Sequence, residues 1–241
     1  MKPELDITMT AVCRPNVVER TLQSLKENLY DVEPRLILHV DPVFEGKGRK
    51  PEKIVRIAGS YFPIRKYHIN REKHPGLPNA ISWCWGHATT EVFLTFEDDW
   101  ILCRPLDAER CIEMMGANKE LTSIQLDGGF GDGSSPSKFI DDAGKQVNNK
   151  DAAVIEGLCH CYRIRRLITL SPSFIRSDWA QFVAYRFKNK RGEPRRIPRT
   201  DNELFDHLYT GDKCLYTQGP GGLVKDIGRQ WQRKTGKRII K

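Results

Sequence analysis

One short segment, EVFLTF from Glu91 to Phe96, constrains the fold of this chain more than any other. It is apolar on both of the faces that an extended strand presents to its surroundings. Strands of this kind lie inside sheets that carry helices on each side. Three further β-prone segments precede it, at 5–12, 36–40 and 66–69. We therefore expect an α/β fold whose first hundred residues form a doubly wound half.

Helix-like segments separate these strands, as a doubly wound half requires. Two of them begin at prolines, the first after Arg14 and the second, spanning 51–61, at Pro51. Apolar residues at helical spacings mark the first and the third helix: Val18, Leu22, Leu25 and Leu29, then Ile81, Cys84, Trp85 and Ala88.

Beyond this half the pattern is less regular, with a strand expected over 121–126 and a helix over 201–209. No linker is long enough to separate two free domains. We therefore expect a single domain made of two halves, residues 1–102 and 103–224, followed by a basic tail, residues 225–241.

The composition excludes several classes of protein. The 241 residues include 39 basic and 31 acidic side chains, a formal net charge of +8. Apolar runs fall short of the roughly 18–20 residues that a membrane helix needs, and the start MKPELDITMT lacks the apolar core of a secretory signal. The seven cysteines are odd in number and scattered, which is typical of reduced thiols. We expect a cytoplasmic protein without a membrane span.

The positive charge is concentrated in two segments, residues 186–199 and 225–241, each with 7 basic residues and 1 acidic residue. Such segments attract polyanions such as DNA, because each Lys or Arg that replaces a phosphate counterion adds affinity. A solvated loop and a solvated tail are the alternative interpretation.

Three adjacent carboxylates, Glu97-Asp98-Asp99, directly follow the apolar strand. In open α/β sheets, ligands gather at the carboxyl ends of the strands. Adjacent carboxylates repel one another unless a cation compensates them, and their hard oxygens suit Mg²⁺ or Mn²⁺ shared with substrate phosphates. The sequence therefore predicts a divalent metal site here, with a solvated acidic turn or helix cap as the alternative.

Four motifs follow one another in the first half: TAVCRPNVVERTLQSL (10–25), LILHVDP (36–42), HPGLPNAISWCWGHA (74–88) and VFLTFEDDW (92–100). In this order they resemble the nucleotide-sugar glycosyltransferases of the GT-A fold, in particular the large inverting family 2. The last motif corresponds to that family's acidic "DxD". The resemblance implies a Rossmann-like mixed sheet flanked by helices, a UDP-linked sugar donor and a bound Mn²⁺ or Mg²⁺.

The resemblance also implies roles for single residues of the first half. Asp41 would bind the nucleobase, and Asp99 would bind the metal. Glu97 stands where the family has an Asp that approaches the ribose or the sugar, so its arm is one methylene longer. The other residues that would line the donor site are Ala11, Cys13, Arg14, Arg71, Asn79 and Asp98. For Arg71, a place in a solvated loop is an equal alternative.

An inverting enzyme needs a carboxylate base that takes the proton from the acceptor hydroxyl. By the same resemblance, SPSFIRSDWA (171–180) is an acceptor segment, and Asp201 or Glu203 is the base. For Asp201, an ordinary helix N-cap is the alternative.

The segment GGLVKDIGRQW (221–231) resembles the family's closing motif. Asp226 replaces a His that often returns to the metal, and its carboxylate is still a suitable ligand for a hard cation. Arg229 would contact phosphate. A turn between two elements is the alternative.

The sequence constrains the acceptor least. The basic segments flank the region of the base and would frame a site for nucleic acid. A compact chain of this kind resembles virus-encoded transferases of the host cytoplasm that glycosylate 5-hydroxymethylpyrimidines in DNA, whose target base has to be flipped out of a duplex. The alternatives are a glycosyltransferase of polysaccharide synthesis, a nucleotidyltransferase and a non-catalytic nucleic-acid-binding protein.

Overall fold

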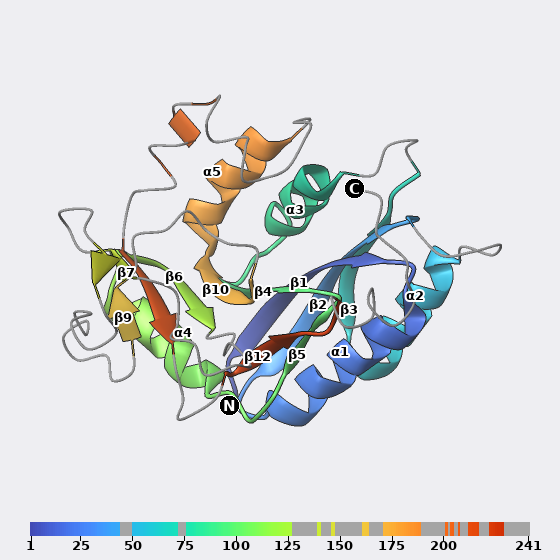
Figure 1. Ribbon diagram of the computed structural model, residues 1–241, viewed down its shortest axis with the longest axis horizontal. Helices are drawn as coiled ribbons and strands as arrows, with labels where there is room; N and C mark the ends of the chain where they lie inside the picture. The colour runs from blue at the N-terminus through green and yellow to red at the C-terminus, as the bar shows by residue number, and fades with distance from the viewer. Residues whose placement is uncertain are drawn as a thin grey trace.

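In the computed structural model, the described residues are 1–43, 50–71, 76–126, 139–140, 146–147, 161–163, 171–188, 201, 203–204, 207, 212–216 and 222–228. Within them one sheet contains the strands β1 (Glu4–Val12), β2 (Glu33–Asp41), β3 (Ile64–Ile69), β4 (Val92–Glu97), β6 (Leu121–Leu126), β9 (Cys161–Arg163), β10 (Ser173–Arg176) and β11 (Asp212–Tyr216). Their order across the sheet is β3-β2-β1-β4-β10-β6-β11-β9 (Figure 1).

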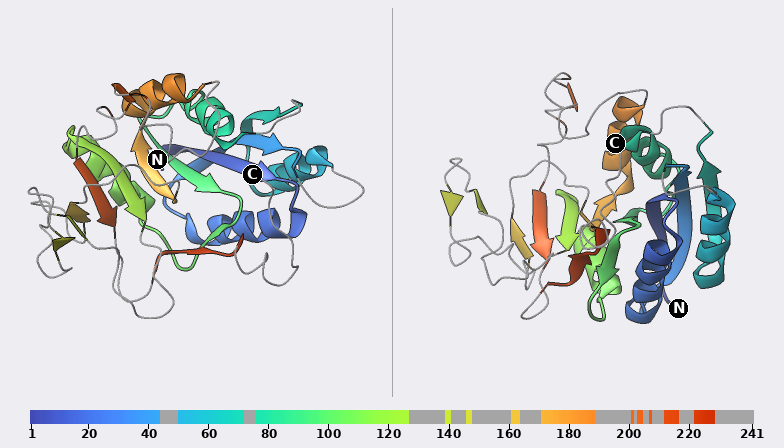
Figure 2. Two further views of the ribbon diagram at one scale, coloured as in Figure 1. Left: turned by 45° about the horizontal axis from the view of Figure 1, so that its top comes forward. Right: turned by 45° about the vertical axis from the view of Figure 1, so that its right-hand side comes forward.

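Helices cover this sheet on both sides, as the apolar β4 strand requires. On one side lie α1 (Pro15–Asn28), α2 (Pro51–Tyr61) and α4 (Ala108–Ala117). On the other side lie α3 (Leu77–Trp85) and α5 (Ser177–Phe187). Figures 1 and 2 show α3 and α5 together above the sheet, with α1 and α2 below it.

The doubly wound first half forms as the sequence predicts. Strands β3, β2, β1 and β4 are parallel neighbours, and α1, α2 and α3 connect them in turn. Pro15, Pro51 and Pro78 stand in the first turns of these helices, where a missing N–H breaks no helical hydrogen bond. The mixed sheet flanked by helices confirms the fold class.

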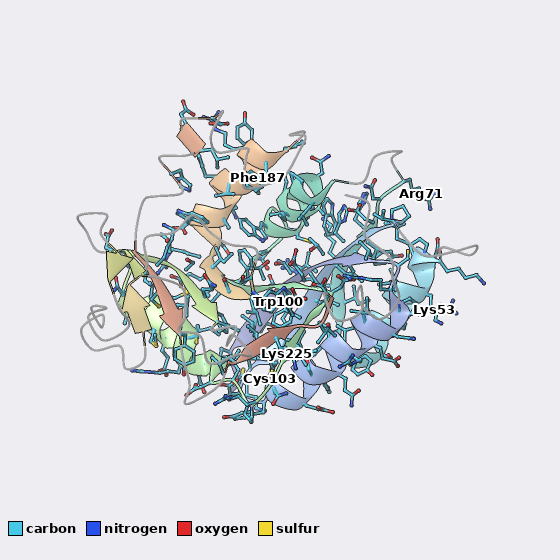
Figure 3. All side chains as sticks on the ribbon, viewed as in Figure 1. Lys53, Arg71, Trp100, Cys103, Phe187 and Lys225 are labelled. Atoms are coloured by element: carbon cyan, nitrogen blue, oxygen red, sulfur yellow. The ribbon has the colours of Figure 1, made fainter. Side chains whose placement is uncertain are left out.

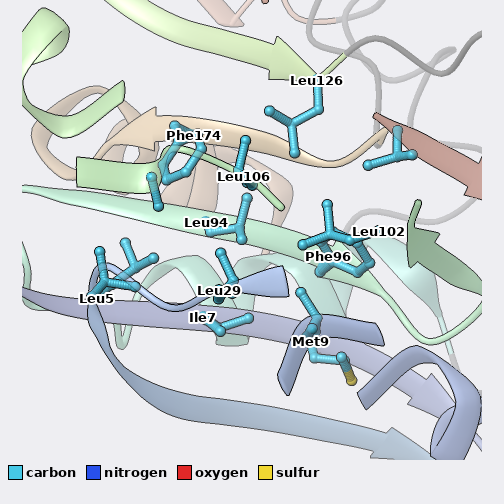
Figure 4. Close-up of a cluster of buried hydrophobic side chains, with 14 of the residues drawn as sticks. Leu5, Ile7, Met9, Leu29, Leu94, Phe96, Leu102, Leu106, Leu126 and Phe174 are labelled. Carbon is cyan, nitrogen blue, oxygen red and sulfur yellow. The ribbon is translucent and has the colours of Figure 1, made fainter. Parts of the chain in front are cut away.

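Two apolar cores lie against the two faces of the sheet, and β4 contributes to both. Leu94 and Phe96 belong to the core under α1, α2 and α4, part of which is drawn in Figure 4. Phe93, which directly precedes Leu94, belongs to the core under α3 and α5 together with Trp85 and Trp179. Successive side chains of β4 point to opposite faces of the sheet, so this one strand packs against the helices on both sides.

Residues 171–180, the expected acceptor segment, contain strand β10 and the beginning of α5, and their role toward an acceptor stays a prediction. Residues 173–176 are all buried and pair antiparallel with both β4 and β6, and α5 begins at Ser177. The predicted halves 1–102 and 103–224 thus share one continuous sheet.

Two further strand pairs lie outside this sheet. β5 (Trp100–Leu102) pairs antiparallel with β12 (Val224–Asp226), and β7 (Phe139–Ile140) pairs with β8 (Gln146–Val147). The first pair returns residues from near the end of the chain to the acidic turn that follows β4. Among the described residues, no helix has the length and apolarity needed to cross a membrane.

Candidate functional site

The candidate site lies where the strand order reverses. The chain runs from β1 outward to β2 and β3, and then returns to the other side of β1 as β4. Ligands of open α/β sheets bind beyond the carboxyl ends of the strands at such a switch point. Cys13 and Arg14 follow β1 here, and Asp98 and Asp99 follow β4.

Asp98 fastens the two strands together. Its Oδ2 accepts a hydrogen bond from the main-chain N–H of Val12 at 3.0 Å, and its Oδ1 contacts Nη2 of Arg14 at 2.5 Å. Thr21 of α1 donates to the main-chain oxygen of Asp98 at 2.8 Å, and Asp98 N donates to Thr10 O at 3.1 Å. The side chain is almost completely buried, so these bonds give Asp98 a structural role.

Arg14 supplies a buried positive charge to the acidic turn. Its Nη2 also contacts Oδ2 of Asp99 at 3.1 Å, and only 2% of its side chain is exposed. Although burial lowers the pKa of Arg14, the Asp98 and Asp99 carboxylates raise it above its ordinary value. The negative charge of the acidic turn was expected to be compensated by a metal ion, whereas in the structure Arg14 compensates part of it. Direct contact of Arg14 with a nucleotide stays a prediction.

Asp99 is the carboxylate of the turn that is open to a ligand, with 20% of its side chain exposed. Burial, followed by the neighbouring Asp98 and Asp226 carboxylates, raises the pKa of Asp99 to about 6, against the opposing effect of Arg14. A divalent cation would relieve this repulsion between carboxylates.

The two-stranded sheet of β5 and β12 brings Asp226 close to Asp99. β12 pairs with β5 so that Asp226 lies opposite Trp100, and Ile227 N donates to Asp99 O at 2.8 Å. Gly228 N donates to Asp226 Oδ1 at 2.8 Å. The structure thus brings together the two residues that were predicted as metal ligands.

Gly228 is required by this close approach. A Cβ added at this position would lie 2.1 Å from Asp99 Oδ2, so any larger residue would displace the Asp99 carboxylate. The segment 221–231 contains this glycine, two residues after Asp226, but sequence reasoning gave the glycine no role.

The two carboxylates fit a Mg²⁺ or Mn²⁺ site of the kind that substrate phosphates complete. Mg²⁺ usually keeps several waters and binds one or two protein carboxylates together with substrate phosphates. Asp99 and Asp226 supply this number of hard oxygen ligands. Within the described ranges, no cluster of three or more His, Cys, Asp or Glu side chains is arranged to hold a metal by itself.

Glu97 and Trp100 flank the acidic turn. Trp100 Nε1 donates to Glu97 Oε2 at 3.3 Å, which holds the longer Glu97 side chain against the indole ring. Both side chains are partly exposed, and Figure 3 shows Trp100 near the centre of the molecule.

Asp41 ends β2, next along the same edge of the sheet. It is 7% exposed, and Asn70 Nδ2 donates to its Oδ1 at 2.8 Å. Cys13 N donates to Val43 O at 3.2 Å, which ties the turn after β1 to the chain just beyond Asp41. Sequence reasoning missed Asn70, although it directly follows β3 at this edge.

The remaining donor-site candidates lie along the same edge or beneath it. Arg71 follows β3 and is exposed (Figure 3), and Asn79 stands in the first turn of α3. Ala11 is 3% exposed and belongs to the core under α1. Arg229 and most of the two basic segments lie outside the described residues.

The two candidates for the base lie beside α5. Asp201 Oδ1 accepts from Leu204 N at 3.0 Å, as a helix N-cap does, and exposed Glu203 forms an ion pair with Arg186 near the end of α5. In Figure 3, Phe187 at that end of α5 lies at the top of the molecule, apart from Trp100. The described contacts of both carboxylates thus anchor their own segment, and a catalytic role stays a prediction.

No family model and no curated protein matches this sequence. Solved structures do match its fold. TarS 1–349 from S. aureus, also solved with UDP-GlcNAc and with UDP, has a TM-score of 0.59 at 15% identity over 92% of this chain, which spans 60% of the TarS chain. HddC from Yersinia pseudotuberculosis has a TM-score of 0.54 at 15% identity, with 97% of this chain and 100% of that chain covered.

A UDP-glucose pyrophosphorylase, solved with UDP-glucose, has a TM-score of 0.53 at 12% identity, with 97% of this chain and 100% of that chain covered. At such identities the likeness concerns architecture. Together with the strand order and the acidic turn after β4, it shows that this chain has the GT-A fold.

Proposed function

We propose that this chain is a metal-dependent glycosyltransferase that moves a sugar from a UDP-linked donor to an acceptor hydroxyl, with inversion. The observation that carries the proposal is the close approach of the Asp226 and Asp99 carboxylates at the topological switch point of a GT-A fold. TarS, which shares this fold, was solved with UDP-GlcNAc, which supports a nucleotide-sugar donor.

Under this proposal each residue of the site has a distinct role. Asp99 and Asp226 hold the cation, and Arg14 and Asp98 hold the acidic turn against β1. When bound, Mn²⁺ or Mg²⁺ stabilises the negative charge that develops on the leaving diphosphate. Asp41 binds the base of the donor, and Asp201 or Glu203 accepts the proton of the acceptor hydroxyl.

Asp99→Asn tests this assignment, because it removes the charge while keeping the shape of the side chain. We expect the metal-dependent affinity for UDP to fall at least tenfold, since a neutral amide is a poor ligand for a hard cation. Calorimetric titration of UDP with Mn²⁺, and again with EDTA, measures the effect.

Glu113→Gln is the matched control, since it makes the same acid-to-amide change on the exposed face of α4. It should bind UDP like the unmodified chain. Metal-dependent UDP binding that survives Asp99→Asn would overturn the proposed metal site.

For the acceptor, we propose a 5-hydroxymethylpyrimidine in DNA, supported by the basic segments 186–199 and 225–241. A panel of UDP-sugars with modified and unmodified DNA should give a mass increase of one sugar on the modified DNA alone. Transfer to a saccharide acceptor with no change in the DNA would favour polysaccharide synthesis instead. Binding of DNA with no response to nucleotide or metal would favour a non-catalytic nucleic-acid-binding protein.

A nucleotidyltransferase is the second candidate, because the UDP-glucose pyrophosphorylase is covered over its whole length by this chain. Such an enzyme also places metal-binding carboxylates at strand ends. Release of pyrophosphate from UTP in the presence of a sugar phosphate would favour it, whereas cleavage of a UDP-sugar would favour the glycosyltransferase.

A further inference from the structure

A buried polar cluster lies at the carboxyl ends of β2 and β3, beside the candidate metal site. It consists of His39, Asp41 and Asn70, which are 3%, 7% and 6% exposed. Side chains two positions apart on a strand share a face, so His39 and Asp41 point to the same side of β2. Asn70 N donates to Val40 O at 2.9 Å, which continues the β2–β3 ladder and places Asn70 beside Asp41.

Both neighbours approach the same oxygen of Asp41. Asn70 Nδ2 donates to Asp41 Oδ1 at 2.8 Å, a normal hydrogen bond. His39 Nδ1 lies 3.8 Å from that oxygen, which is too long for a hydrogen bond. Asn70 therefore holds the Asp41 carboxylate by a hydrogen bond. His39 Nδ1 faces the same carboxylate from a distance about 1 Å longer than a hydrogen bond.

The Nδ1 atom of His39 is buried and has no hydrogen-bond partner in the described structure. A buried polar atom without a partner is destabilising, and such atoms are uncommon enough in proteins to require a reason. The ring cannot swing away, because His68 and Trp83 pack against it at centroid distances of 5.0 and 5.8 Å. Nδ1 is thus kept beside Asp41 without bonding to it.

Building on the proposed function, we propose that His39 and Asn70 are positioning residues that hold the Asp41 carboxylate for a ring N–H of the donor's base. A carboxylate only accepts hydrogen bonds at neutral pH. Uracil and guanine present an N–H at N3 and N1, whereas cytosine and adenine present a lone pair there. A base N–H draws the carboxylate into place, and His39 then donates its Nδ1–H to it, as contacts in binding sites tighten on ligation.

This arrangement favours uracil and guanine over cytosine and adenine by the free energy of one hydrogen bond, from the base N–H to the charged Asp41 carboxylate. A site built to bond an N–H rejects the analogue that lacks it, because the buried acceptor is then left unpaired. The role of Asn70 and His39 is to prevent Asp41 from turning toward other partners when the base is wrong. Their removal should therefore reduce discrimination between bases more than it reduces binding of the diphosphate.

The test compares three variants of the full chain, Asn70→Leu, His39→Leu and His39→Asn. The amide nitrogen of Asn can take the place of His Nδ1, so His39→Asn is the conservative variant. Calorimetry in saturating Mn²⁺ measures the affinity for UDP, GDP, CDP and ADP, and inorganic pyrophosphate serves as the base-free probe. Tyr67→Leu is the matched control, because Tyr67 lies on the opposite face of β3 and is 55% exposed.

We expect the unmodified chain to prefer UDP or GDP over CDP and ADP, and the stronger of the first two identifies the base. Asn70→Leu and His39→Leu should weaken that binding about tenfold, the value of one charge-assisted hydrogen bond, with affinity for pyrophosphate unchanged. His39→Asn should recover most of the loss, and Tyr67→Leu should change nothing.

An unchanged ratio of UDP or GDP to CDP affinity in Asn70→Leu and His39→Leu would overturn the inference while leaving the proposed function intact. An unmodified chain that binds neither pyrophosphate nor any nucleoside diphosphate with Mn²⁺ would instead overturn the proposed function, and the inference with it. Retained pyrophosphate binding shows in each variant that the chain is folded.

Discussion

His39 is a histidine that the fold keeps neutral. Burial, with a smaller contribution from the charge on His68, lowers the pKa of His39 to about 3. Asp41 also faces the ring, and the buried thiol of Cys84, whose own pKa is raised by burial, contacts the main chain of His39. Between about pH 3 and pH 6.5 the unfolded chain therefore binds one more proton at this residue than the folded chain does.

This difference predicts a dependence of stability on pH. Because the folded pKa lies below the unfolded value, the contribution of His39 is complete above about pH 6.5 and is lost as the pH falls. The free energy of unfolding should drop by about 2 kcal/mol from this residue between pH 7 and pH 5. Urea denaturation of the unmodified chain and of His39→Asn at both pH values measures it, and equal slopes with pH would contradict the prediction.

Gly228 gives a second prediction at the scale of one residue. A Cβ at this position would meet Asp99 Oδ2 at 2.1 Å, so Gly228→Ala must displace the carboxylate or β12. We expect metal-dependent UDP affinity to fall about tenfold or more, because a misplaced ligand no longer reaches the cation. Titration calorimetry measures the loss.

Gly116→Ala provides the comparison for this substitution. A Cβ added at Gly116, in α4, would meet nothing within 4 Å, so the same chemical change should leave UDP binding unaltered. Equal binding by Gly228→Ala and Gly116→Ala would show that the approach of Gly228 to Asp99 is not needed for the ligand.

At the scale of elements, Arg176 joins β10, α4 and β6. This buried arginine donates to the main-chain oxygens of Leu121 and Asn118 at 3.3 and 3.1 Å, and to that of Met115. Its Nη1 also contacts Glu91 at 3.1 Å. The bonds to Met115 and Asn118 reach carbonyl groups at the end of α4 that have no partner within the helix, and the bond to Leu121 reaches the start of β6.

Arg176→Leu should therefore destabilise the protein by about 3 kcal/mol, since it removes the guanidinium donor from the carbonyl groups of Met115, Asn118 and Leu121 and breaks the ion pair with Glu91. Lys119→Ala removes another basic partner of Glu91, but from an exposed pair, and should change stability by less than about 1 kcal/mol. Thermal or urea unfolding of both variants checks the contrast. A similar loss in the two would mean that the Arg176 hydrogen bonds contribute little.

Across the whole molecule, local patterns predict the first half well and the second half poorly. β1, β2 and β4 are β-prone apolar segments, α1 and α3 carry apolar periodicity, and Pro51 marks the start of α2, so the sequence alone indicates them. β10 does not, because Ser173 and Arg176 are buried only through their pairing with neighbours that are distant in sequence. Pairing across the fold, and not local pattern, makes this segment a central strand.

The candidate site divides in the same way. The acidic turn follows from its position at a strand end, and Asp41 and Asp226 were found through a resemblance to family motifs. The buried contact of Arg14 with Asp98 and Asp99, and the cluster of His39, Asp41 and Asn70, depend on the register between strands. No spacing along one strand encodes that register, so sequence reasoning could not find them.

The pairing of β12 with β5 also bears on how the protein is made. A ribosome releases Asp99 and the strands around it well before it reaches Asp226 and Gly228, so a nascent chain would at first carry only one of the two carboxylates of the proposed metal site. Under the proposed function, metal-dependent binding of the donor would then be gained only after residue 228 has been added. Copies terminated before that residue would be unable to sequester the donor.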